Sequence, residues 1–236
     1  REGGLWVGTW GGGLNKIVQK TGQFHHYQHN PDDPQSLSNN YVYSIYEDEM
    51  GILWVGTKGG LNRFDRDTGQ FRHYRHDQEN PTSLGNDNVR AIYTDQTGKL
   101  WIGTRGGGLS RFVRSTEQFQ HYRHDSHDPH SLRSDDVWSV YEDQEGILWI
   151  GTRDGLHTFD RNTAQFQHYR HDPNDPQSLV GNNLRVMYED RVGIVWIGTW
   201  GDGLSAFDPD TKQFYPYQYD PDDSQSLSDN FVLSIY

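Results

Sequence analysis

One position that could bind a ligand occurs five times along the chain, each time directly after a Thr in a repeated motif. Its occupants are Trp10, Lys58, Arg105, Arg153 and Trp200. An indole face stacks on a sugar ring or on a cation, and a guanidinium fork binds a carboxylate, sulfate or phosphate. These residues therefore predict a site for an acidic saccharide or another anionic ligand. The alternative is that they cover the ends of the repeats and pair with aspartates of the loops.

A second variable position follows the first Val or Leu of another repeated motif. Its occupants are Tyr43, Arg90, Trp138, Arg185 and Leu233. Some of these side chains could line a central channel. We favour the other interpretation, in which they pack between neighbouring repeats.

Pairs of histidines three residues apart suggest metal binding at first sight. The pairs are His73 and His76, His121 and His124, and His168 and His171. On a strand, residues three apart point to opposite faces, so a pair cannot close on one ion. We predict no metal site here, and expect the imidazoles to coat an outer rim that is pH-sensitive below neutrality.

Clustered acids lie in the long polar connections. They are Asp32 and Asp33, Asp125 and Asp128, Asp172 and Asp175, and Asp220, Asp222 and Asp223. Oxygen-rich loops can hold calcium, but Asp-Pro and Asn-Asp segments also form turns in which the side chain bonds the local backbone. We favour the turns and predict no cofactor.

The chain lacks the asymmetric set of groups that catalysis needs, such as a nucleophile with a base or two carboxylates in different environments. Every acid recurs with the repeat, and no copy gains a distinctive set. The Gly-rich turns are not phosphate loops, because no helix and no Lys-Ser/Thr pair follows them. We predict a non-catalytic protein, with a lyase or glycosidase as a second alternative.

The element that positions these residues is one segment of about 47 residues written five times. Its motif Leu-Trp-Val-Gly-Thr begins at Leu5, Leu53, Leu100, Leu148 and, with Val in place of Leu, at Val195. A fixed period in this range indicates one supersecondary unit repeated around an axis or along a solenoid.

Each repeat reads as four short strands joined by tight turns. In one copy these are residues 88–93, 100–104, 109–113 and 118–124. Such a meander buries both faces only when several copies stack, which predicts an all-β fold, a β-propeller of five four-stranded antiparallel blades. Residues 1–236 would form a single β-propeller domain or a propeller fragment. A linear β-solenoid is the rival.

The turn before the fourth strand ends in a residue that favours the left-handed conformation, as Gly69 does. Glu117, Ala164 and Lys212 stand there in other copies. Each would cost up to roughly 1 kcal/mol if that conformation is kept.

The two ends of the sequence read as complementary halves of one blade. Arg1 to Trp6 aligns with the turn between the first two strands, and residues 231–236 align with a first strand. We therefore expect residues 231–236 to pair with residues 5–9 and close the last blade. The alternative is strand exchange between two chains, which gives a ten-bladed ring; the protein would be a monomer or a strand-exchanged homodimer.

Composition excludes several kinds of partner. The net charge of −12 disfavours nucleic acids and anionic membrane surfaces. Cysteine is absent, which rules out disulfides and thiolate metal sites. No segment reads as a membrane span or a secretory signal. A small molecule or a glycan is the partner that we expect.

The pattern Val-x-x-Val-Tyr-Glu-Asp-x-x-Gly-x-Leu-Trp-Ile-Gly-Thr-x-x-Gly-Leu, at residues 137–156, resembles the two-component regulator propeller repeat. The connection at residues 172–179 is similar to that family as well. The resemblance implies the periplasmic or extracytoplasmic sensor region of a bacterial hybrid sensor kinase, often a carbohydrate sensor. The family usually has more repeats, in two propellers of about seven blades, together with membrane-spanning and kinase segments. The other expectation is an amplified or excised scaffold with no independent function.

Overall fold

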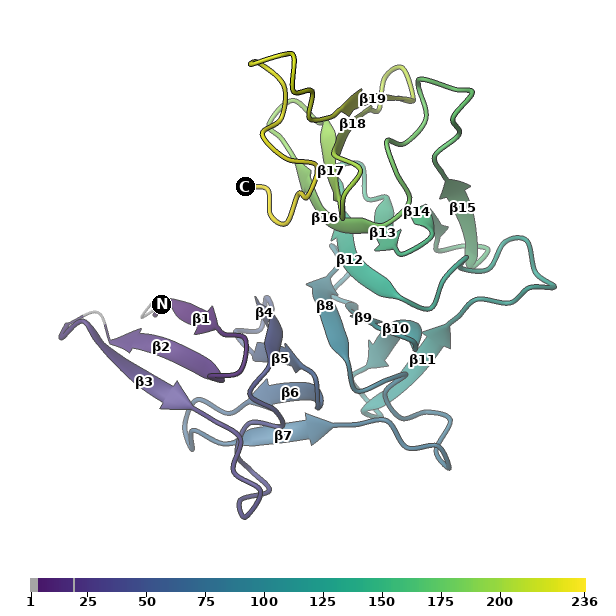
Figure 1. Cartoon of the computed structure of the whole chain (residues 1–236). Helices are drawn as coiled ribbons and strands as arrows, with labels where there is room; N and C mark the ends of the chain where they lie inside the picture. The colour runs from purple at the N-terminus through teal and green to yellow at the C-terminus, as the bar shows by residue number, and fades with distance from the viewer. Residues whose placement is uncertain (1–3, 19) are drawn as a thin grey trace. The chain divides into compact units, whose positions relative to one another are not determined.

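The computed structural model describes residues 4–18 and 20–236, so Arg1 to Gly3 of the predicted first turn lie outside the described residues. Over that part of the chain the structure contains nineteen strands (Figure 1). None of the described residues forms a helix that could cross a membrane. The contacts divide the chain into two compact units, residues 1–121 and 122–236.

The first unit contains three antiparallel sheets, each a meander of consecutive strands. The strands are β1 (Trp6–Gly8), β2 (Leu14–Val18) and β3 (Gln23–Tyr27); β4 (Val42–Glu47), β5 (Leu53–Thr57), β6 (Gly60–Phe64) and β7 (Phe71–Tyr74); and β8 (Val89–Thr94), β9 (Leu100–Thr104), β10 (Gly108–Val113) and β11 (Gln118–Tyr122).

The second unit repeats the same meander in two sheets of four strands. The strands are β12 (Val137–Glu142), β13 (Leu148–Thr152), β14 (Gly155–Asp160) and β15 (Gln165–Tyr169); and β16 (Leu184–Glu189), β17 (Val195–Thr199), β18 (Leu204–Asp208) and β19 (Gln213–Tyr217). The predicted four-stranded antiparallel repeat is therefore confirmed in four copies.

The first sheet departs from the prediction because it has three strands. Residues 231–236 were expected to supply its fourth, but Phe231 makes only one antiparallel bridge, with Trp200, and residues 232–236 form no strand. Instead, the Val232 amide donates to the Thr199 carbonyl at 3.0 Å, so the segment packs on the fifth sheet. The predicted pairing of residues 5–9 with residues 231–236 would join the two units, and it stays a prediction.

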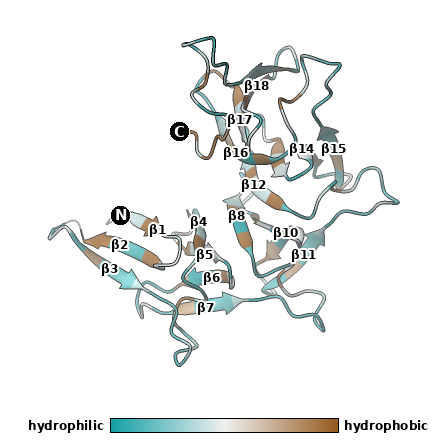
Figure 2. Ribbon diagram, in the orientation of Figure 1, coloured by the Kyte–Doolittle hydropathy of each residue, from teal (hydrophilic) through white to brown (hydrophobic). Residues whose placement is uncertain are grey.

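Within each unit, neighbouring sheets join through an apolar core between them. One core brings together the buried Trp54 and Leu61 of the second sheet with Ile102, Phe112 and Phe119 of the third. Many hydrophobic residues lie on the strands, and the connections are largely hydrophilic apart from buried leucines such as Leu84 (Figure 2). Trp54, Phe112 and Phe119 are aromatic members of this core, and each ring contributes a large buried area.

The Gly of the repeated motif allows neighbouring sheets to approach closely. A Cβ atom at Gly56 would stand 2.7 Å from Val89 Cγ1 on the first strand of the next sheet. At Gly8 the corresponding contact is 2.6 Å, with Val42 Cγ1. The motif is therefore a packing device, because any side chain at its Gly would push two sheets apart.

A buried carboxylate locks the turn between the first two strands of a repeat. The Trp54 indole N–H donates to Asp48 Oδ2 at 2.9 Å, and the Ile52 amide donates to Asp48 Oδ1 at 2.9 Å. Although burial raises the pKa of Asp48, the hydrogen bonds from Trp54 and Arg114 lower it overall. The same Trp–Asp bond occurs at Trp101, Trp149 and Trp196.

The left-handed turn positions are confirmed. Glu117, Ala164 and Lys212 have φ angles of 55°, 57° and 59°, and Gly69 has 73° at the matching place. The turn geometry therefore persists even where the residue carries a side chain.

Candidate functional site

The five predicted ligand residues occupy equivalent places at the end of a second strand. The preceding Thr is tied to the turn and is buried in the four later copies; Thr57 Oγ1, for example, donates to the Gly60 carbonyl at 3.0 Å. The Lys58 amide donates to the Tyr41 carbonyl at 3.1 Å, and the Trp200 amide to the Asn183 carbonyl at 2.9 Å. The backbone is thus held on both sides while the side chain projects outward.

In the first unit, the structure brings Trp10 and Lys58 together around Tyr41. The Trp10 and Tyr41 rings meet edge to face at 5.8 Å, and Lys58 Nζ lies 5.6 Å from the centre of the Tyr41 ring. Tyr43 also meets Trp10 edge to face, at 5.5 Å, and the Arg90 guanidinium stacks 3.7 Å from the Tyr43 ring. We call these five residues the Trp10 cluster.

Arg105 belongs to the same unit but not to this cluster. Its amide donates to the Asn88 carbonyl at 2.9 Å. Its exposed side chain makes no hydrogen bond or ion pair with the part of the chain that the structure describes. The prediction that it binds a ligand remains a prediction.

A β-bulge explains how Tyr43 and Arg90 reach the cluster. The pairing of β4 with β5 slips between Val42 and Ser44, and that of β8 with β9 slips between Val89 and Ala91. A bulge leaves one residue outside the ladder and turns its side chain out of the regular alternation. The second variable position of the sequence is this bulge residue in every complete blade: Tyr43, Arg90, Trp138 and Arg185.

In the second unit, Arg185 lies between two indoles. Its guanidinium is 3.9 Å from the centre of the Trp138 ring and 4.5 Å from that of the Trp200 ring. Phe231 meets the Trp200 ring edge to face at 5.3 Å. We call these four residues the Trp200 cluster.

The two tryptophans that the sequence treats as equal therefore differ. Trp10 is 76% exposed and makes edge-to-face contacts with Tyr41 and Tyr43, whereas Trp200 is 46% exposed and already carries Arg185. An open indole face is available for stacking on a ligand at Trp10, and the Arg185 guanidinium already stacks on the ring at Trp200.

Arg153 makes the kind of contact that the alternative interpretation predicted, an ion pair with a loop aspartate. Its side chain is 67% exposed and lies 3.8 Å from Asp136 Oδ2. It also lines an open cavity of about 720 Å³ in the second unit, together with Asp172, Asp175 and Asp202. The acids outnumber the cation there, which disfavours an anionic ligand in that cavity.

Tyr41 and Phe231 are members of these clusters that the sequence analysis missed. Each stands directly before a first strand, and each packs on the Trp of the preceding repeat. The sequence held a signal for both residues. This position is aromatic only where the preceding repeat has a Trp at the predicted ligand position; elsewhere it is Asn88, Asp136 or Asn183.

In two of the three histidine pairs, each imidazole contacts a different backbone carbonyl. His76 Nδ1 lies 2.8 Å from the Leu84 carbonyl, whereas His73 Nε2 lies 2.6 Å from the Ser36 carbonyl. His171 and His168 repeat this arrangement with Leu179 and Pro129. These imidazoles fasten the connections, and among the described residues no three ligand-type side chains form a group that could hold a metal.

The acids of the connections accept hydrogen bonds from their own turns. Asp33 Oδ1 accepts from the Gln35 amide at 2.9 Å, and Asp175 Oδ1 from the Gln177 amide at 2.9 Å. Such turns occupy the carboxylate oxygens with local backbone donors. This supports the interpretation of these acids as turn formers.

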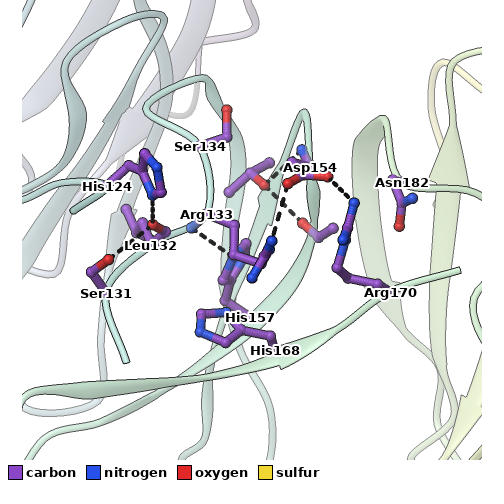
Figure 3. A network of polar contacts seen from close by, with 12 residues as sticks. His124, Ser131, Leu132, Arg133, Ser134, Asp154, His157, His168, Arg170 and Asn182 are labelled. Carbon is purple, nitrogen blue, oxygen red and sulfur yellow. Dashed lines mark hydrogen bonds and ion pairs between the residues drawn. The ribbon is translucent and has the colours of Figure 1, made fainter. Parts of the chain in front are cut away.

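The fourth blade (β12–β15) holds a polar network around Asp154. Asp154 lies between two arginines, 2.6 Å from Arg170 and 3.5 Å from Arg133 (Figure 3). Beneath it, His157 Nε2 accepts from the Arg133 amide at 3.3 Å. Burial lowers the pKa of His157 to about 3, so the ring is neutral.

The comparisons with known proteins agree with this architecture. The model of the two component regulator propeller matches residues 36–59, 83–106, 131–154 and 178–201. Among curated proteins, no sequence matches the chain.

Solved structures show the fold to be a β-propeller. A structure described as the extracellular domain of a hybrid two component system, BT3049 from B. thetaiotaomicron, is 29% identical with a TM-score of 0.80. It matches 99% of this chain, which spans only 29% of that structure. A similar domain of BT4673 from the same organism is 24% identical over 92% of this chain and 29% of its own, with a TM-score of 0.72.

A propeller enzyme shares the fold at a greater distance. Virginiamycin B lyase from Staphylococcus aureus is 16% identical over 93% of this chain and 68% of its own, with a TM-score of 0.66. At that identity the likeness concerns the fold alone.

Proposed function

Because the chain is built from two-component regulator propeller repeats, we propose that it is a non-catalytic, ligand-binding part of an extracytoplasmic sensor. The extracellular location of the similar BT3049 domain supports this proposal. We further propose that the ligand is an acidic carbohydrate, with Trp10 as the principal contact. Lys58 and Arg105 would contribute within the first unit, and Arg153 and Trp200 separately within the second unit.

One observation carries the proposal, the open indole face of Trp10. An exposed Trp costs solubility unless it has a partner, and here Tyr41 and Tyr43 hold its ring in one orientation by edge-to-face contacts. Rigid aromatic platforms lose little entropy when a sugar ring stacks on them. Lys58 and Arg90 lie on the same two tyrosines and supply positive charge beside the platform, which favours an acidic sugar.

We predict that Trp10→Ala weakens binding of a glucuronate-containing oligosaccharide at least about tenfold, a loss of about 1.4 kcal/mol. Isothermal titration calorimetry would measure the affinity of the native chain and of the variant. Trp10→Phe keeps an aromatic face and should retain part of the affinity.

Phe24→Ala is the matched control, since it removes another exposed aromatic ring outside the Trp10 cluster. Its affinity should equal that of the native chain. If the oligosaccharide binds the native chain and Trp10→Ala with the same affinity, the site lies elsewhere.

A further inference from the structure

The fourth blade (β12–β15) carries a pair of opposite charges, Arg133 and Asp154, at two loop positions. Arg133 stands where the other connections have Ser38, Gly85, Val180 or Ser228. Asp154 stands where the matching turn of the second blade has Gly59. In a chain of near-identical repeats, a charged pair confined to one copy is not required by the fold.

The backbone of Arg133 is anchored in the same way as in the other blades. The Arg133 amide donates to His157 at 3.3 Å, just as the Ser38 amide donates to Asn62 at 2.9 Å and the Val180 amide to Ser205 at 3.0 Å. Removing the Arg133 side chain would leave this anchor in place. The side chain is therefore free to serve another purpose.

One carboxylate between two guanidinium groups leaves a positive charge. Arg133, Arg170 and Asp154 are 43%, 45% and 35% exposed, so solvent reaches all three. Each guanidinium has five donors, and each contacts Asp154 through one nitrogen. The remaining donors of both arginines have no partner among the described residues.

The neighbouring imidazoles of His157 and His168 add no charge to this site. Burial lowers the pKa of both His157 and His168, and the charges of Arg133 and Arg170 lower the two values further. Both rings are therefore neutral at neutral pH, and the positive charge belongs to the two arginines (Figure 3).

We propose that Arg133 and Arg170 form a second anion site, which binds the carboxylate or sulfate group of a small acidic ligand while Asp154 holds the two guanidinium groups apart. Arg forks suit both groups because their paired donors match two oxygens of either. The proposal does not depend on the Trp10 cluster, which lies in the other unit.

The test is a titration of the full chain with sodium glucuronate and, separately, sodium sulfate, at constant ionic strength. Glucose and sodium chloride are the neutral and non-specific controls. Chemical shifts of labelled arginine side chains would report saturation at Arg133 and Arg170. Binding of both probes assigns a general oxyanion site, and binding of one alone assigns the carboxylate or the sulfate.

Residues that stand at the matching positions of other repeats give substitutions that should keep the fold. Arg133→Ser copies Ser38 and Arg170→Gln copies Gln28, and each should weaken binding at least tenfold with an unchanged melting temperature. Asp154→Asn removes the competing charge and should tighten binding several-fold. If Arg133, Asp154 and Arg170 have only a structural role, neither anion should show saturable binding, and that result would overturn the proposal. An unchanged affinity in Arg133→Ser would overturn it as well.

Discussion

At the scale of single residues, one buried position in the third strand decides how each connection is held. Its occupants are Asn15, Asn62, Ser110, His157 and Ser205. Different side chains can occupy this position, because each offers an oxygen or nitrogen atom that hydrogen-bonds a buried loop amide or a neighbouring imidazole. His157 is the one among them that can titrate.

His157 predicts acid sensitivity. The unfolded chain protonates this residue near pH 6.5, whereas burial keeps it neutral in the folded chain down to about pH 3. The unfolded state thus binds more protons between these values, so stability rises with pH across that window. The native chain should lose about 2 kcal/mol more than His157→Asn when pH falls from 7 to 5, as urea unfolding would measure.

The native chain is compared with His157→Asn because burial also lowers the pKa values of His73 and His168. Those two histidines change the stability in the same direction, and the comparison cancels their contribution. His157→Asn copies Asn62 and retains an acceptor for the Arg133 amide. Parallel pH profiles for the native chain and the variant would contradict the assignment.

At the scale of elements, two local devices shape every complete blade. A bulge in the first strand turns one side chain out of the ladder, and a left-handed residue closes the turn before the fourth strand. The turn was predictable, because a Gly stands there in the second copy and the other copies align with it. The bulge was not, since no residue type in a sequence such as Val42-Tyr43-Ser44 distinguishes a bulge from regular alternation.

The turn yields a stability prediction. Ala164 has a φ of 57°, a conformation that costs an L-residue up to about 1 kcal/mol. Ala164→Gly should therefore raise the free energy of unfolding by a few tenths to about 1 kcal/mol, measured by urea denaturation. Gly69→Ala, at the matching turn with a φ of 73°, is the reciprocal control and should lower it. A loss of stability in Ala164→Gly would show that the entropy of the unfolded chain outweighs the strain.

At the scale of the whole molecule, charge limits the partners. The chain carries −12, and several of its arginines are tied to acids, as Arg66 is to Glu47 and Arg161 to Glu142. The positive sites described above are small exceptions on an acidic surface. Binding at them must rely on local geometry, because the overall field repels anions.

This gives a prediction for macromolecular partners. The chain should show no retention by duplex DNA or by vesicles rich in anionic lipid, even at about 20 mM salt, where screening is weak. Co-sedimentation and gel-shift assays would measure this, with neutral vesicles as the matched control. Salt-sensitive binding to either polyanion would reveal a basic surface that the charge distribution does not show.

The sequence by itself determined the repeat, the strands and the left-handed turns, since all of these follow from local periodicity and backbone geometry. It also marked Trp10 and Trp200, but it could not separate them. Only the tertiary structure placed Arg185 on one indole and left the other open, and only it brought Arg133 and Arg170 to a single carboxylate. These contacts join residues from different strands and loops, so their distances depend on the packing of the sheets and not on spacing along the chain.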